Sequence, residues 1–170
     1  MKKMKITLLS AMLFLGTTAV LKAQNIVEVA VGNDNFTTLV TAVKAADLVE
    51  TLSGNGPFTV FAPVNDAFAA LPEGTVATLL KPESKDALTG VLTYHVVAGE
   101  YKAAAVIEAI KGNDGTFPVT TVQGGIIELS LMDGKVMLKD EKGNVATVVM
   151  ADVAASNGVI HAIDTVVMPK

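Results

Sequence analysis

The spacing of apolar residues changes once along this chain, and the change limits the fold more than any other feature. Before Pro118 apolar residues recur at helical spacing, whereas after it they alternate with polar residues, as over residues 127–131. Helices are therefore expected first and strands last, with tight turns between successive strands. This order predicts an α+β domain whose sheet is largely antiparallel.

The helical part of the chain divides at clusters of turn-forming residues. Apolar positions over residues 36–52 fit one stripe, which predicts a helix that begins after the polar residues 33–35 and ends at residues 53–57. Either Asn65 or Asp66 is expected to cap the next helix. Further helices are predicted over residues 65–71, 72–80, 82–92 and 103–110.

Strands are indicated by β-branched and aromatic runs between turn signals. Residues 58–61 form such a run, and Ala62-Pro63 ends it. Asp133-Gly134 lies between two apolar runs, a pattern that is the strongest short-range signal of a hairpin. A second turn is predicted at residues 142–144, with strands over 145–150 and 159–167.

The N-terminus has the layout of a secretory signal peptide. Residues 1–5 hold three lysines, residues 6–20 are an apolar run, and Ala23 stands at a small-residue cleavage position. The run is shorter than the roughly 20 residues that span a bilayer, so cleavage is favoured over an uncleaved anchor. We expect residues 1–23 to be removed, leaving residues 24–170 as a single secreted or periplasmic domain. Without cysteine, no lipid anchor can be attached through a thiol.

Composition narrows the classes of partner. Residues 24–170 hold nine lysines against seventeen acidic residues, a net charge of −8, and the chain has no arginine. An acidic surface without guanidinium groups is a poor match for phosphate, so nucleic acid is not an expected partner. The chain also has no cysteine, so its stability must come from packing rather than from disulfides.

Three segments along the chain resemble the signature segments of fasciclin (FAS1) domains. Phe58–Phe68 is similar to the first signature, T-x-F-A-P-T-N-x-A-F, with valine at position 64 in place of threonine. Tyr94-His95 resembles the central Tyr-His motif, and Asn157–Asp164 resembles the second signature. Residues counted as structural parts of these signatures are Phe61, Pro63, Asn65, Phe68, Asn157, Gly158, His161 and Asp164.

This resemblance implies a fold and a set of candidate contacts. Fasciclin domains are compact α+β units in which a wedge of about seven mostly antiparallel strands packs against several helices. In animal members the Tyr-His region and an Asp-Ile pair before the second signature are associated with integrin-type adhesion. The matching positions are Tyr94, His95, Asp152 and Val153, with valine in place of isoleucine. Tyr94 and His95 have a structural alternative, which is packing and hydrogen bonding across a helix–strand junction.

The residues of the second signature need no catalytic role. In a strand that begins near Val159, His161 shares a face with apolar neighbours, so we expect a neutral, buried ring bonded to backbone. Asn157-Gly158 is expected to form the turn into this strand. Asp164 falls on the opposite face, where a solvated or capping role is expected.

An enzyme is not expected. The chain has two histidines far apart in sequence, no cysteine, no glycine-rich phosphate loop and no nucleophile elbow. No catalytic residue, metal ligand or cofactor site is therefore predicted.

Three functions fit these observations. The leading hypothesis is a secreted adhesion or interaction module that binds a cell-surface protein, a matrix protein or a polysaccharide, as a monomer or weak homo-oligomer. One alternative is a carrier of an apolar small ligand, with flexible methionines such as Met132, Met137 and Met150 lining a groove. Another is a structural or stress-related envelope protein without a dedicated ligand.

Overall fold

The computed structural model describes residues 23–170. The predicted signal peptide, apart from Ala23, lies outside the described residues. Within the described part of the chain, no helix is both long and apolar enough to cross a membrane.

Helices dominate the first part of the chain and strands the last, as the change of period predicts. The helices are α1 (Ile26–Val31), α2 (Thr37–Ala45), α3 (Val49–Ser53), α4 (Asn65–Ala69), α5 (Thr75–Leu79), α6 (Lys85–Tyr94) and α7 (Ala103–Gly112), with 3-10 turns η1 (Asp34–Phe36) and η2 (Pro82–Ser84). The strands are β1 (Phe58–Pro63), β2 (Val96–Ala98), β3 (Thr116–Thr120), β4 (Ile126–Met132), β5 (Lys135–Lys139), β6 (Val145–Ala155) and β7 (Gly158–Ile163).

The seven strands form one sheet in the order β2-β1-β7-β6-β5-β4-β3. Every neighbouring pair is antiparallel except β1 and β7, which are parallel. The long strand β6 joins the two halves, because its first residues pair with β5 and its later residues pair with β7 across two irregularities. The α+β class and the largely antiparallel sheet of seven strands are confirmed.

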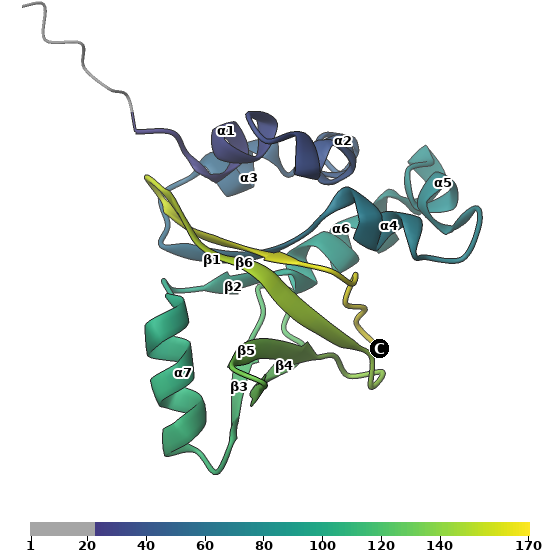
Figure 1. The fold of residues 1–170 in the computed structure, drawn as a ribbon. Helices are drawn as coiled ribbons and strands as arrows, with labels where there is room; N and C mark the ends of the chain where they lie inside the picture. Colours follow the sequence, from purple (N-terminus) through teal and green to yellow (C-terminus); the bar gives the residue numbers. More distant parts are fainter. Residues whose placement is uncertain (1–22) are drawn as a thin grey trace, which may run out of the picture.

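The sheet separates two cores. Figure 1 shows α1, α2 and α3 on one side of the layer that contains β1 and β6, and α7 on the other side. Val60 and Ile160 point into the core under the helices of the first half. Phe61 and Ile163 point to the other face, where Ile110 of α7 and the inward side chains of β3 to β6 complete a second core. Both faces of β1 and β7 are therefore buried, which holds the two signature strands at the centre of the molecule.

The structure differs from the predicted elements at several ends. The single helix predicted over residues 36–52 is interrupted at Asp47, whose φ of 56° is left-handed, so α2 and α3 replace it, and the 3-10 turn η1 precedes α2. Residues 26–31, to which the sequence patterns assign no element, are a helix that begins with a capping box of Asn25 and Glu28. Strand β6 runs to Ala155, five residues beyond its predicted end, and β7 stops at Ile163, short of Val167.

The predicted hairpin at Asp133-Gly134 is confirmed. Both residues have positive φ, 51° and 77°, as a two-residue turn between β4 and β5 requires. Met132 and Lys135 are the last paired residues before the turn.

Candidate functional site

Asn157, at the turn before β7, joins three segments that are distant in sequence. Its Oδ1 accepts a hydrogen bond from the backbone N–H of Ile26, at 2.9 Å. Its Nδ2 donates to the carbonyls of Leu52 and Gly54, at 2.8 and 2.9 Å. Asn157 therefore does more than form the predicted turn, because it ties the start of α1 and the end of α3 to the signature strand.

Gly158 is required by close approach to β1. A Cβ at this position would lie 2.0 Å from the carbonyl oxygen of Phe58, the residue with which Gly158 pairs in the parallel ladder. No side chain fits between the two backbones at that distance.

His161 lies in the interior between β7, β6 and the loop before α7. The side chain is 3% exposed, and its ring stacks on Phe61 with 5.8 Å between centroids. Nδ1 accepts from the N–H of Asp152 at 3.2 Å, so the proton sits on Nε2, which donates to the carbonyl of Tyr101 at 2.7 Å. The ring thus serves two backbone groups and leaves no nitrogen free for a substrate.

Replacing His161 by alanine is expected to lower the free energy of unfolding by about 1–3 kcal/mol, because it leaves two buried backbone groups without partners. Chemical denaturation measures the change, with Thr120→Ala on an exposed strand position as the control, expected within about 0.5 kcal/mol of wild type. An unchanged unfolding midpoint for His161→Ala would show that the ring stabilises nothing.

Asn65 does not cap its own helix, so that prediction is wrong. The N-cap position of α4 is Val64, and no side chain bonds to the helix start there. The Oδ1 of Asn65 instead accepts from the N–H of Thr38 at 3.1 Å, and its Nδ2 donates to the carbonyl of Asp34 at 2.8 Å. The side chain therefore satisfies the free N–H of another helix, α2, because the turn after β1 carries it there.

The other signature residues also support the fold. Phe61, Pro63 and Phe68 are buried. Asp164 is exposed, and its Oδ1 accepts from the N–H of Thr147 at 2.8 Å, which fastens the end of β7 to β6.

Tyr94 is completely buried at the end of α6. Its hydroxyl donates to the carbonyl of Ile126 at 2.8 Å and accepts from the N–H of Glu141 at 3.2 Å. Burial raises the pKa of the phenol to about 12, and the nearby Glu141 and Asp140 carboxylates add to the increase. Tyr94 therefore stays neutral and connects α6 to the start of β4 and to the turn before β6.

His95 holds the C-terminal segment. The side chain is 2% exposed; its Nδ1–H donates to the carbonyl of Val91 at 2.7 Å, and its Nε2 accepts from the N–H of Val167 at 3.2 Å. Burial lowers the pKa of the ring to about 4, so the imidazole is neutral at physiological pH. Next to it, the buried Asp140 accepts from the N–H of Met168 at 2.9 Å.

Asp152 and Val153 lie in the irregular part of β6. Asp152 is exposed, with a φ of 56°, and its Oδ1 accepts from the N–H of Ala103, the first residue of α7, at 2.8 Å. Val153 is half-buried. Asp152 bonds to α7, His95 bonds to Val167 in the C-terminal segment, and Tyr94 bonds to β4 and to the turn before β6. Among the hydrogen bonds of the described residues, none joins Asp152-Val153 to Tyr94-His95. Partner contact by these four residues stays a prediction.

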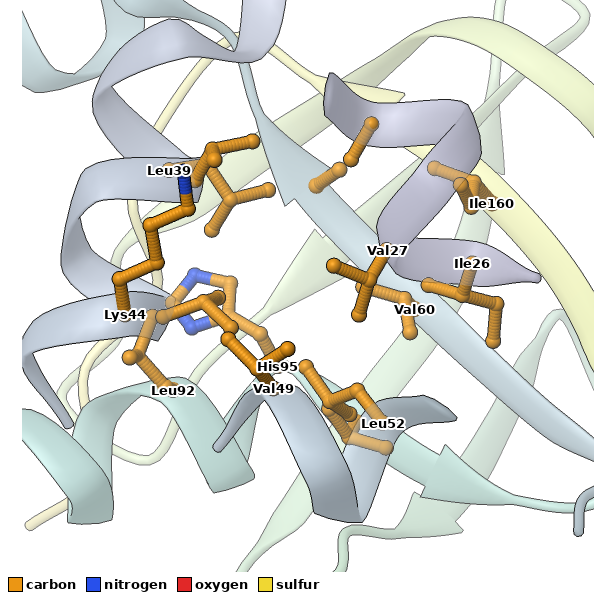
Figure 2. Close-up of a pocket in the computed structure, with 15 residues that line it drawn as sticks. Ile26, Val27, Leu39, Lys44, Val49, Leu52, Val60, Leu92, His95 and Ile160 are labelled. Carbon is orange, nitrogen blue, oxygen red and sulfur yellow. The ribbon is translucent and has the colours of Figure 1, made fainter. Parts of the chain in front are cut away.

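An apolar cleft lies beneath the first helices, and its lining differs from the methionine-lined groove of the carrier hypothesis. It lies between α1, α2 and α3, with β1, β7 and the ring of His95 at its floor (Figure 2). Its lining is apolar apart from Lys44 and His95. Its cavity volume of about 30 Å³ has room for about two water molecules. No methionine lines it, and Met132 and Met150 are instead exposed by 61% and 43%.

The chemistry of the described residues is limited. Among residues 23–170, no group of three histidine, aspartate or glutamate side chains is placed to hold a metal ion. Both histidines use their ring nitrogens on backbone groups. The arrangement therefore fastens strands, helices and the C-terminal segment together and leaves the exposed surface for contact.

Comparison with known proteins gives a consistent result. The sequence is 53% identical over 147 residues to Protein sll1483 of Synechocystis sp., which covers 86% of this chain and 74% of that protein. It is 36% identical to the transforming growth factor-beta-induced protein ig-h3 of Sus scrofa, over 85% of this chain and 19% of that protein. The solved FAS1 domain pair of the insect cell adhesion molecule fasciclin I superposes with a TM-score of 0.64 at 20% identity, over 80% of this chain and 46% of that chain.

The family description Fasciclin domain matches residues 34–169, which include all three signature segments. With the relatives above and the sheet of seven strands, this match shows that the chain belongs to the fasciclin domain family.

Proposed function

We propose that this protein is an extracytoplasmic, non-enzymatic interaction module that attaches to a cell-surface protein, a matrix protein or a polysaccharide. The observation that carries the proposal is the use of the signature residues. The polar side-chain groups of four of them form hydrogen bonds to the backbone: Tyr94, His95, Asn157 and His161. The family pattern therefore specifies a scaffold rather than a reaction centre. Relatives named as a cell surface glycolipoprotein of Mycobacterium bovis and an insect cell adhesion molecule support a role at surfaces.

The proposed route to that surface is export. The predicted signal peptide, residues 1–23, would be removed and residues 24–170 would act outside the cytoplasm. The proposed contact position is Asp152-Val153, because Asp152 is exposed where β6 meets α7. Tyr94 and His95 would support binding indirectly, because His95 fixes the C-terminal segment and Tyr94 fixes β4 and the turn before β6.

The direct test is a binding isotherm of purified residues 24–170 on intact cells and on isolated envelope polysaccharides. Saturable binding to one of them is expected, and it should disappear when the protein is unfolded. A known surface-binding protein serves as the positive control. If the positive control binds and the folded domain does not, the proposal is wrong.

The carrier alternative rests on the apolar cleft beneath α1. Its volume of about 30 Å³ is far below the 300–1,000 Å³ of typical ligand pockets, so the cleft would have to widen before a ligand could enter. Native mass spectrometry of protein purified from its own source decides the question. A bound apolar ligand would support the carrier, and an empty chain would count against it.

A further inference from the structure

The outer face of strands β3 to β6 is a surface that no function above explains. We define it as the side chains of these strands that point away from α7. The opposite side chains, such as Ile127, Leu129 and Leu138, are fully buried in the core beneath α7. On the outer face Ile126, Met132 and Val145 are exposed by 47%, 61% and 47%.

The strand register places this face in ordered rows. Across the four strands, one row reads Pro118, Glu128, Lys139 and Val145. Its centre is the Glu128–Lys139 ion pair, with 3.6 Å between Nζ and Oε2, and both side chains are more than half exposed. The row therefore has an apolar residue at each end and opposite charges in the middle.

The charge of this face differs from that of the rest of the domain. It holds two lysines, Lys135 and Lys139, and one acid, Glu128, whereas residues 24–170 hold nine lysines and seventeen acids. A second copy that docked through any strongly acidic surface would be repelled. The outer face avoids most of that repulsion.

The row is also complementary to itself. Consider a two-fold axis that runs along the strands, between β4 and β5, in the plane of contact between two copies. It places β4 over the second copy's β5 and β3 over the second copy's β6, with the rows in alignment. Glu128 then faces Lys139 of the second copy, and Pro118 faces Val145, with each contact made twice. Each contact along the row therefore joins either two opposite charges or two apolar side chains.

We propose that this protein forms a homodimer through the outer face of β3 to β6. Four strands about 4.8 Å apart and about five residues of about 3.4 Å each, the length of β3 and of β5, give a face of about 330 Å² per copy. A stable interface buries about 800 Å² per partner, so the dimer is weak and forms only at high concentration, with a dissociation constant in the micromolar range or above.

Sedimentation velocity of residues 24–170 from about 5 µM to about 1 mM tests the proposal. Wild type is expected to change from monomer to dimer across this range. Lys139→Glu and Glu128→Lys each place like charges opposite one another twice, so each should weaken association at least tenfold. The double variant restores opposite charges in both contacts and should recover the wild-type dissociation constant.

Two controls make the result specific. Lys81→Glu reverses an exposed charge in the loop before α6, outside the face, and should leave association unchanged. Thermal melts of all variants exclude unfolding as the cause of a loss. A wild type that stays monomeric at 1 mM overturns the proposal. A dimer that persists equally in both single variants also overturns it, because the interface would then lie elsewhere.

Discussion

Replacing Gly158 by alanine is expected to lower the free energy of unfolding by at least about 3 kcal/mol, or to prevent folding. A Cβ at this position would lie 2.0 Å from the carbonyl oxygen of Phe58, which is backbone and cannot rotate away. To remove this clash, β1 and β7 would have to separate where they pair in parallel, between the two cores. Overpacking against backbone in the middle of a sheet costs more than the usual 1–3 kcal/mol of an enlarged core side chain.

Gly90→Ala is the matched control for this change. Gly90 lies inside α6, and a Cβ there would meet nothing within 4 Å. Because alanine favours the helix, the variant should be more stable by about 0.5–1 kcal/mol. Urea denaturation measures both variants. A Gly158→Ala protein as stable as wild type would show that the two strands do not approach as closely as described.

Acidification is expected to remove about 3 kcal/mol of stability through His95 alone. Burial holds the pKa of the folded ring near 4, whereas the unfolded ring titrates near 6.5. Between these values the unfolded chain binds a proton that the folded chain does not. The contribution is therefore complete above pH 6.5, is lost as the pH falls toward 4, and is constant below 4.

Two measurements check this pH dependence. The unfolding free energy of wild type, determined between pH 8 and 4, should fall more steeply than that of His95→Gln, which cannot take up the proton. Titration of the wild-type ring by NMR gives its pKa without any substitution. A folded His95 that titrates near 6.5 would contradict its burial between Val91 and the N–H of Val167.

Local patterns in the sequence predicted most of the elements. The change from helical to alternating spacing gave the order of helices and strands, and Asp133-Gly134 gave a hairpin that the register confirms. The pattern failed at Asp47, because apolar spacing on either side of a left-handed residue can still fit one stripe. In β7 both faces are buried, so apolar and polar residues do not alternate and the pattern could not show where the strand ends.

The roles of the polar signature residues could not be derived from local sequence. Asn157 bonds to groups more than 100 positions away, and Asn65 bonds to α2 rather than to its own helix. Such partners are fixed by the tertiary fold, which periodicity does not encode. Tyr94-His95 was identifiable as a helix–strand junction, but only the structure shows that Val167 lies against His95.

The most direct test of the central claim is a quantitative pull-down from surface extracts with three folded proteins. These are wild type, Tyr94→Phe, and a variant that combines Asp152→Asn with Val153→Ala. Asparagine keeps an oxygen for the N–H of Ala103 and removes only the charge. If the buried signature builds the scaffold and Asp152-Val153 makes the contact, Tyr94→Phe captures the same partner as wild type and the combined variant loses at least tenfold in affinity. The account is contradicted if the combined variant binds as wild type does, or if folded Tyr94→Phe loses the partner.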